Sequence, residues 1–372
     1  MRNRFVMLIG GAAMAAAFAT VLPTRLAGQT KAAAPAQKAP AAAAMPRTPD
    51  GHPDFTGTYD LAMLTPLERP NGLPAVLSDE EAAKREKEAE RKVVEGDAKI
   101  AGDRTAPPKG GDGSVGAAGN VGGYNTFWLD GGTKYPKING ERRTSLIVDP
   151  PDGRVPALTP EARQRNLSRL AQFRAPTSDA SESQDPGLEP AGAYDDPERR
   201  PLGERCILGF GSTSGPPALP NYFYNNLHQI VQTRDRVMIQ TEMVHDARIV
   251  RMNAEHLPPA IRSWMGDSVG HWEGDTLVVD TTNFTDKTRF RNSTQNLHVV
   301  ERFSRLDRNN LLYRFTIEDP QTWTRPWTGE MAWPATSERI YEYACHEGNY
   351  ALGDILRGAR LREAEAAKTK EK

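Results

Sequence analysis

The chain has 372 residues, of which 29 are Pro, 32 are Gly and 38% are hydrophobic. A chain so rich in turn formers suits many short strands better than long helices. The formal net charge is −1 and no basic stripe is interleaved with aromatic residues, so we expect no nucleic-acid partner.

Residues 1–28 predict a secretory signal peptide. Arg2 and Arg4 give it a basic start, and residues 5–19 form an apolar run rich in Ala. The alternative is an uncleaved membrane anchor, which the short apolar run and the Gly10-Gly11 interruption disfavour. We therefore expect an exported protein, periplasmic or secreted, with no stable membrane span after cleavage.

The next segments change in composition along the chain. Residues 29–45 are almost all Ala, Pro, Lys and Gln, which predicts a tether without a core. The N-terminal part of the folded domain then spans 46–203. Within it the patterns predict a solvated helix over 78–95, a mobile loop or lid over 102–123, a hairpin over 142–155 and a helix over 159–173.

Residues 204–358 form the predicted β core, and residues 359–372 a charged tail. Turns of a few residues separate the predicted strands, which favours an antiparallel meander that closes into a barrel, calycin-like by analogy. The fold class is thus mainly β, with a few short helices and long N-terminal loops. Strands are predicted over 228–232, 237–244, 247–252, a hairpin within 266–284, 298–306, 311–317 and 339–345, with one helical turn over 258–265.

The chain contains two cysteines, Cys206 and Cys345. In an exported protein a lone pair of cysteines is expected to form a disulfide. If Cys345 were free, the adjacent His346 would suggest a thiol nucleophile, although adjacency in sequence rarely gives the required geometry.

Several longer segments resemble a family of exported bacterial proteins with no established activity. They cover most of residues 49–360, and the resemblance implies export and a shared fold but no catalytic residue. The segments are Pro49-Asp50-Gly51-His52-Pro53-Asp54, Glu204-Arg205-Cys206, His245-Asp246-Ala247-Arg248, Gly266 to Phe284, Glu301-Arg302-Phe303, Trp323 to Trp327 and Tyr341 to Tyr350.

The richest polar cluster lies where one predicted strand ends and the next begins. It consists of Glu242, His245, Asp246 and Arg248. A His beside carboxylates suits a general base, and an Arg can hold an anionic group in a forked geometry. The other interpretation is a salt-bridged corner between strands.

Glu301 is the second polar anomaly, because it shares one face of its strand with Val299 and Phe303. A carboxylate on a buried face either pairs with an Arg or acts as an acid with a raised pKa. Asp280 also interrupts a β-branched strand, on a less apolar face.

A metal site drawn from His245, His346 and Glu347, with His228 or His271, remains open, since imidazole and carboxylate suit zinc or copper. No tight ligand spacing supports it, and the sequence leaves the cofactor undetermined. The run from His346 lacks the second His of a zincin helix.

We expect an exported, soluble barrel that binds a small molecule, with Glu242, Arg248, His271, His346 and Glu347 as candidate binding residues. One alternative is a hydrolase or lyase in which His245 is the base and Asp246 or Glu242 orients it. In that enzyme Arg248 would hold an anionic group and Glu301 would donate a proton. Another is a structural or interaction module of the cell envelope. The sequence does not determine the oligomeric state.

Overall fold

The computed structural model describes residues 45–96, 129–174, 194–210, 215–221 and 224–370. The predicted signal peptide, most of the tether and the predicted loop over 102–123 lie outside these residues. The described part of the chain contains three α-helices, α1 (Asp79–Gly96), α2 (Pro160–Arg174) and α3 (Tyr350–Lys370).

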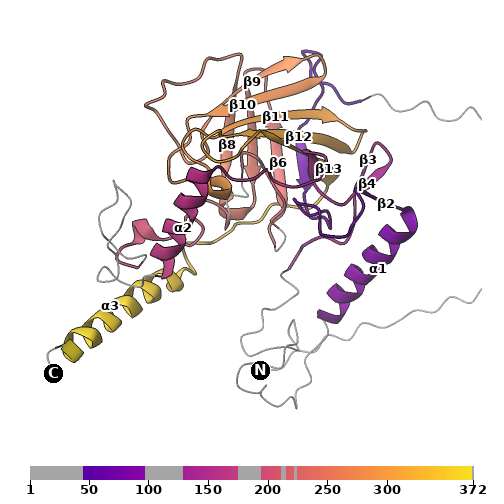
Figure 1. The fold of residues 1–372 in the computed structure, drawn as a ribbon. Coiled ribbons are helices and arrows are strands. Elements are labelled where there is room, and N and C mark those ends of the chain that lie inside the picture. Colours follow the sequence, from indigo (N-terminus) through magenta and orange to yellow (C-terminus); the bar gives the residue numbers. More distant parts are fainter. Residues whose placement is uncertain (1–44, 97–128, 175–193, 211–214, 222–223, 371–372) are drawn as a thin grey trace, which may run out of the picture. The chain divides into compact units, whose positions relative to one another are not determined.

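Nine strands form a closed β-barrel, seen in Figure 1, which confirms the predicted fold class. Strand β1 hydrogen-bonds to β6 on one side and to β13 on the other, so the sheet has no free edge at that point. The barrel strands are β1 (Gly57–Asp60), β6 (Leu227–Gln232), β7 (Arg236–Thr241), β8 (Ala247–Met252), β9 (Asp267–Glu273), β10 (Thr276–Thr282), β11 (His298–Arg305), β12 (Asn310–Glu318) and β13 (Trp327–Thr336).

The expected antiparallel meander holds for every neighbouring pair of the barrel except β8 and β9. These two strands are parallel and share only two register pairs, Arg251 with Val269 and Met252 with Gly270. The prediction failed there because residues 253–266 cross from one end of the barrel to the other instead of turning back. No helical turn forms over 258–265, where the chain makes hydrogen-bonded turns.

Two further strand predictions are wrong. Residues 339–345 form no strand, and the last barrel strand is β13, which the prediction missed although Trp327, Met331 and Trp333 are buried along it. The predicted hairpin over 142–155 is also absent, because its halves pair elsewhere: β4 (Glu141–Arg143) joins β2 (Val76–Leu77) and β3 (Lys137–Ile138), whereas β5 (Ile147–Asp149) joins β13.

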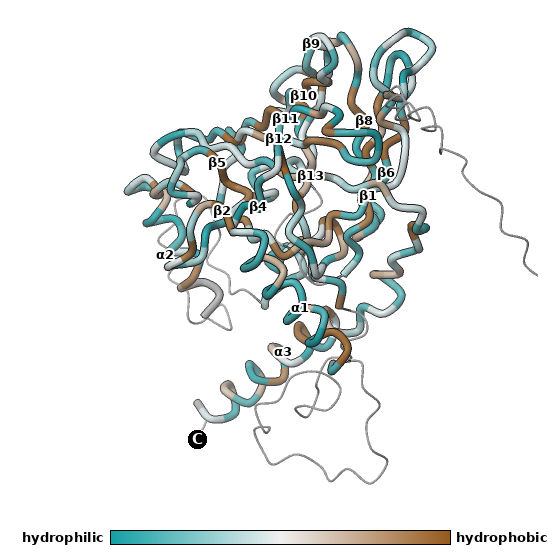
Figure 2. Tube along the Cα trace, turned by 90° about the vertical axis from the view of Figure 1, so that its right-hand side faces the viewer, coloured by the Kyte–Doolittle hydropathy of each residue, from teal (hydrophilic) through white to brown (hydrophobic). Residues whose placement is uncertain are grey.

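The barrel interior is filled by large side chains. Phe303, Tyr313, Phe315, Trp327 and Trp333 are fully buried and contact one another through their rings. Figure 2 shows hydrophobic and hydrophilic residues mixed along the strands, as expected where one side chain points inward and the next outward. The aromatic residues thus form a packed core.

The Cys206–Cys345 disulfide is present and links residues 139 apart. It ties the segment that follows β13 to the segment that precedes β6. Within the described residues, no helix is both long and apolar enough to span a membrane.

Candidate functional site

Polar side chains line one end of the barrel interior on five consecutive strands. They are His228 on β6, Thr241 on β7, Arg248 on β8, Ser268 on β9 and Thr281 on β10, and all are buried. We call this set the polar half-ring.

The opposite side of the same end is apolar. Thr281 lies in register with Val299, Val299 with Ile317, and Ile317 with Trp327. Each polar residue sits at an inward position, because the residue two places further into its strand is also buried. The interior at this end is therefore polar on one side and apolar on the other.

Arg248 and Glu301 form an ion pair across the interior. Arg248 Nη1 lies 2.5 Å from Glu301 Oε2, and Nη2 lies 2.8 Å from Oε1, which is a forked geometry. The Arg248 side chain is 6% exposed and that of Glu301 is 0% exposed. The sequence alternative in which Glu301 pairs with an Arg is the one the structure forms.

Hydrogen bonds extend this pair in both directions. Tyr313 donates its hydroxyl to Glu301 Oε1 at 2.8 Å and accepts the backbone N–H of Ala218 at 3.0 Å. Burial, followed by the charge of Glu301, raises the pKa of Tyr313 well above its usual value, so this hydroxyl remains protonated. Arg248 also donates to Ser268 Oγ, which lies 2.8 Å from the hydroxyl of Thr281.

His228 is the member of the half-ring with an open hydrogen-bonding position. Its Nδ1 lies 3.1 Å from the carbonyl oxygen of Asn226, whereas its buried Nε2 has no partner. Burial, the largest effect, and the nearby charge of Arg248 together lower the pKa of His228 to about 4, against the opposing effect of the Asn226 contact. The ring is therefore neutral at neutral pH. The sequence assigned His228 only to a tentative metal set, because a lone His in a strand carries no spacing signal.

The predicted cluster around His245 has a structural role at the same end. Glu242 Oε1 accepts the backbone N–H of Tyr341 at 3.0 Å, and His245 Nε2 accepts that of Tyr343 at 2.6 Å. Val244 between them has a φ of 62°, which is unusual for a β-branched residue. The turn thus holds residues 341–345, which the disulfide also holds; we call this segment the strap.

The remaining predicted residues do not join the interior. Asp246 lies in the β7–β8 connection, where its carbonyl oxygen accepts the N–H of Thr241. His346 and Glu347 are exposed just beyond the strap. His271 lies on the outer face of β9 and contacts Glu273 at 3.3 Å.

His245 and Glu301, the base and the acid of the hydrolase or lyase alternative, do not contact each other. His245 is exposed and its Nε2 is hydrogen-bonded, whereas Glu301 is inside the barrel and bonded to Arg248. The geometry therefore does not support a proton-transfer pair made of these two residues. Among the residues that the structure describes, no group of three or more His, Cys, Asp or Glu side chains is placed to hold a metal ion.

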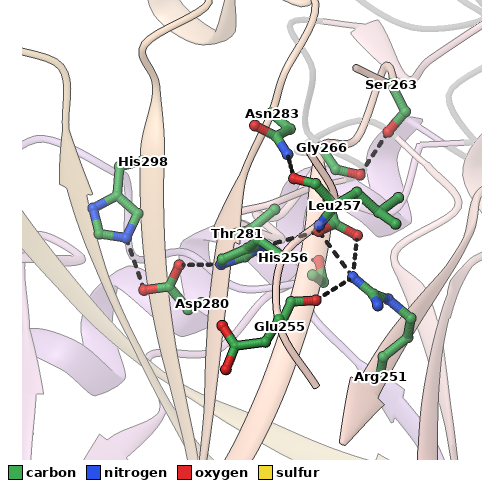
Figure 3. Close-up of polar contacts among 12 residues, drawn as sticks. Arg251, Glu255, His256, Leu257, Ser263, Gly266, Asp280, Thr281, Asn283 and His298 are labelled. Atoms are coloured by element: carbon green, nitrogen blue, oxygen red, sulfur yellow. Dashed lines mark hydrogen bonds and ion pairs between the residues drawn. The ribbon is translucent and has the colours of Figure 1, made fainter. Parts of the chain in front are cut away.

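A second group of polar side chains lies on the outside of the barrel, and Figure 3 shows contacts within this group. His256, in the crossover after β8, places Nδ1 3.0 Å from Asp267 Oδ2 and Nε2 2.9 Å from Asp280 Oδ1. Asp280 Oδ2 lies 2.8 Å from His298 Nε2, and Arg251 pairs with Asp267. We call these five residues the outer ionic chain.

Opposite charges shift the pKa values in this chain. The Asp280 contact raises the pKa of His298. Burial alone would raise the pKa of Asp280, but hydrogen bonds from His298 and His256 outweigh burial and lower it. Burial would likewise raise the pKa of Asp267, and hydrogen bonds from the Leu257 backbone, His256 and Arg251 lower it. The sequence singled out only Asp280, because His256 lies in an irregular segment.

The inner and outer arrangements share two strands. Asp267 precedes Ser268 on β9, and Asp280 precedes Thr281 on β10. Since successive side chains of a strand point to opposite faces, the acids hold His256 outside while the hydroxyls contact each other inside. The crossover is thus anchored directly behind the polar half-ring.

Comparisons with family models, with curated proteins and with solved structures found no match.

Proposed function

We propose that this protein is a small-molecule-binding β-barrel whose ligand lies at the polar half-ring. The observation that carries this proposal is the fully buried ring of His228, whose Nε2 has no partner beside a hydrogen-bonded Arg248–Glu301 pair. Buried polar atoms in proteins nearly always have a partner, so an open position calls for a molecule that fills it.

The energetics of the interior agree with a binding role. A buried ion pair is often no more stabilising than apolar side chains of the same volume, so stability alone does not explain Arg248 and Glu301 inside an aromatic core. Barrel mouths are also common ligand sites, with apolar walls and a few polar groups that set orientation. Here Trp333 supplies an apolar wall next to His228, at 5.2 Å between ring centroids.

Export is part of the proposal. The N-terminal sequence predicts it, and the Cys206–Cys345 disulfide supports it, because such bonds persist in oxidising compartments. The resemblance to exported bacterial proteins points the same way. The strap and the segment around Ala218 would cover the ligand at this end of the barrel, since Tyr341 donates to Glu242, the residue after Thr241, and Ala218 donates to Tyr313.

The test is to extract small molecules from the purified protein and identify them by mass spectrometry, with a His228→Phe variant beside it. Phe keeps an aromatic ring at this position and removes Nε2. A molecule bound at the half-ring is expected in the extract of the native protein and depleted in that of the variant. The matched control is His271→Phe, which alters an exposed His on the outer face of β9.

Equal extracts from all three proteins would contradict the proposal if, in addition, no compound of a metabolite library stabilised the native protein more than His228→Phe. In that case the interior would be a core alone, and the protein a structural module.

A further inference from the structure

The chemistry of the open position in the half-ring defines what it accepts. His228 Nδ1 faces the carbonyl oxygen of Asn226, which only accepts hydrogen bonds. Nδ1 therefore carries the proton of the neutral ring, and Nε2 presents a lone pair. A group bound at Nε2 must donate a hydrogen bond.

The ring that packs beside His228 carries a second atom with an open hydrogen-bonding position. The Trp333 ring packs against the ring of His228, and its buried Nε1 has no partner. An indole N–H only donates, so a group bound there must accept a hydrogen bond. A hydroxyl group has both properties, since it donates one hydrogen bond and accepts others.

The charges around these atoms are already balanced. Arg248 directs Nη1 and Nη2 to Glu301, and Nη1 also to Ser268, while Tyr313 donates to the same carboxylate. No positive charge is left in this network to hold a carboxylate or phosphate. An anion at the half-ring would lose its hydration without a matching cation, which is costly in a buried site.

The surroundings are aromatic. The Trp333 ring lies 4.9 Å from Tyr313, 5.5 Å from Phe303 and 6.1 Å from Tyr59, centroid to centroid. A ligand that reaches Nε1 of Trp333 therefore lies among apolar ring surfaces, which favour an apolar body next to the hydroxyl group.

We infer that the ligand of the polar half-ring is an uncharged alcohol or phenol, whose hydroxyl group donates to His228 Nε2 and accepts from Trp333 Nε1. This inference rests on the proposed function, because it takes the half-ring to be a binding site. It excludes carboxylates and phosphates as the primary ligands.

The experiment compares three probes of similar size, phenol, toluene and benzoate, by isothermal titration calorimetry on the full chain. Phenol is expected to bind at least about tenfold more tightly than toluene or benzoate, the effect of about one hydrogen bond. His228→Phe is expected to remove the preference for phenol over toluene. His271→Phe is expected to retain it.

A measurement on the native protein accompanies the titration and does not depend on any variant that might misfold. The nitrogen-15 chemical shift of His228 Nε2 reports whether its lone pair accepts a hydrogen bond. Phenol is expected to change this shift, and toluene to leave it unchanged.

The two proposals fail in different ways. If benzoate binds more tightly than phenol and His228→Phe abolishes its binding, the hydroxyl class is wrong and the proposed site stands. If no probe binds and none changes the Nε2 chemical shift, the hydroxyl class is rejected. If the Nε2 chemical shift of the protein without any probe already indicates a hydrogen bond, an ordered water is assigned to these atoms. The extraction experiment then decides the proposed function by itself.

Discussion

At the scale of single residues, the Arg248–Glu301 pair dominates the interior of the barrel. Both charges are buried and each satisfies the other, with Tyr313 and Ser268 completing the contacts. In such a pair the loss of one partner costs more than the loss of both, because the remaining charge is left buried and unpaired.

Glu301→Leu is therefore expected to destabilise the protein by about 3–5 kcal/mol. The double variant Arg248→Met with Glu301→Leu is expected to lose much less, since no unpaired charge remains. Urea denaturation of the three proteins measures both values. A double variant as unstable as the single one would show that the pair itself, rather than charge compensation, stabilises the core.

The outer ionic chain gives a pH dependence at His298. The Asp280 contact raises the pKa of His298 in the folded protein above its usual 6.5. Its stabilising contribution is thus fully present below about pH 6.5 and is lost as the pH rises through the higher, folded value. Asp280 and Asp267, with lowered pKa values, lose their contributions only at acid pH.

We expect the urea midpoint of the native protein to fall between about pH 6 and about pH 9, and this fall to be smaller in His298→Gln. The difference between the two proteins isolates His298 from the ionisable groups near it, Glu318 at 3.7 Å and His256 on the far side of Asp280. Parallel curves for the two proteins would remove His298 as the cause.

At the scale of secondary-structure elements, β12 and β13 approach closely at Gly329. A Cβ atom at this position would lie 2.1 Å from Cζ of Phe315, a fully buried ring in the opposing strand. Gly329→Ala is expected to destabilise the protein by about 1–3 kcal/mol through overpacking. Gly348→Ala is the control, because a Cβ there meets nothing within 4 Å. Thermal unfolding of both variants measures the contrast.

The strap is the second element with a direct test. The disulfide and the contacts to Glu242 and His245 hold it at the polar end of the barrel. In a Cys206→Ala, Cys345→Ala variant we expect faster hydrogen exchange at the amides of Tyr341 and Tyr343, and a loss of up to about 4–5 kcal/mol of stability by the chain-entropy model.

Exchange in β11 and β12 is expected to stay slow in the same variant, because the ladder between these strands does not involve the strap. Unchanged exchange at both strap amides would show that the side chains of Glu242 and His245 hold this segment without the covalent link.

At the scale of the whole molecule, four residues of β1 close a barrel whose other strands lie far along the chain. Thr58 and Tyr59 pair with β13 and β6 at once. Removal of residues 45–60 would expose two strand edges and delete Phe55 and Tyr59 from the core.

We expect the protein without residues 45–60 to be expanded and self-associating, as measured by size-exclusion chromatography with light scattering. Removal of residues 364–372 is the control and is expected to leave the native profile, since the described part of that stretch is exposed. A compact monomer without β1 would mean that the remaining strands close among themselves.

The sequence by itself determined the fold class, the helices α1 and α2, and the disulfide. These follow from local signals: alternating strands between short turns, helix-capping residues, and two cysteines in a chain expected to be exported. It also identified Glu301 as a polar residue out of place, because period two puts it on an apolar face, and it named Arg248 as a candidate to hold an anionic group.

Only the tertiary structure decided which polar residues meet. Arg248 and Glu301 lie on strands separated by two others, and His228 joins them through barrel curvature, which no spacing along the chain encodes. The sequence predicted a catalytic or binding role for Glu242 and His245, yet their hydrogen-bond partners are backbone N–H groups of the strap. Sequence proximity reports local geometry, whereas a site inside a closed barrel depends on how distant strands come into register.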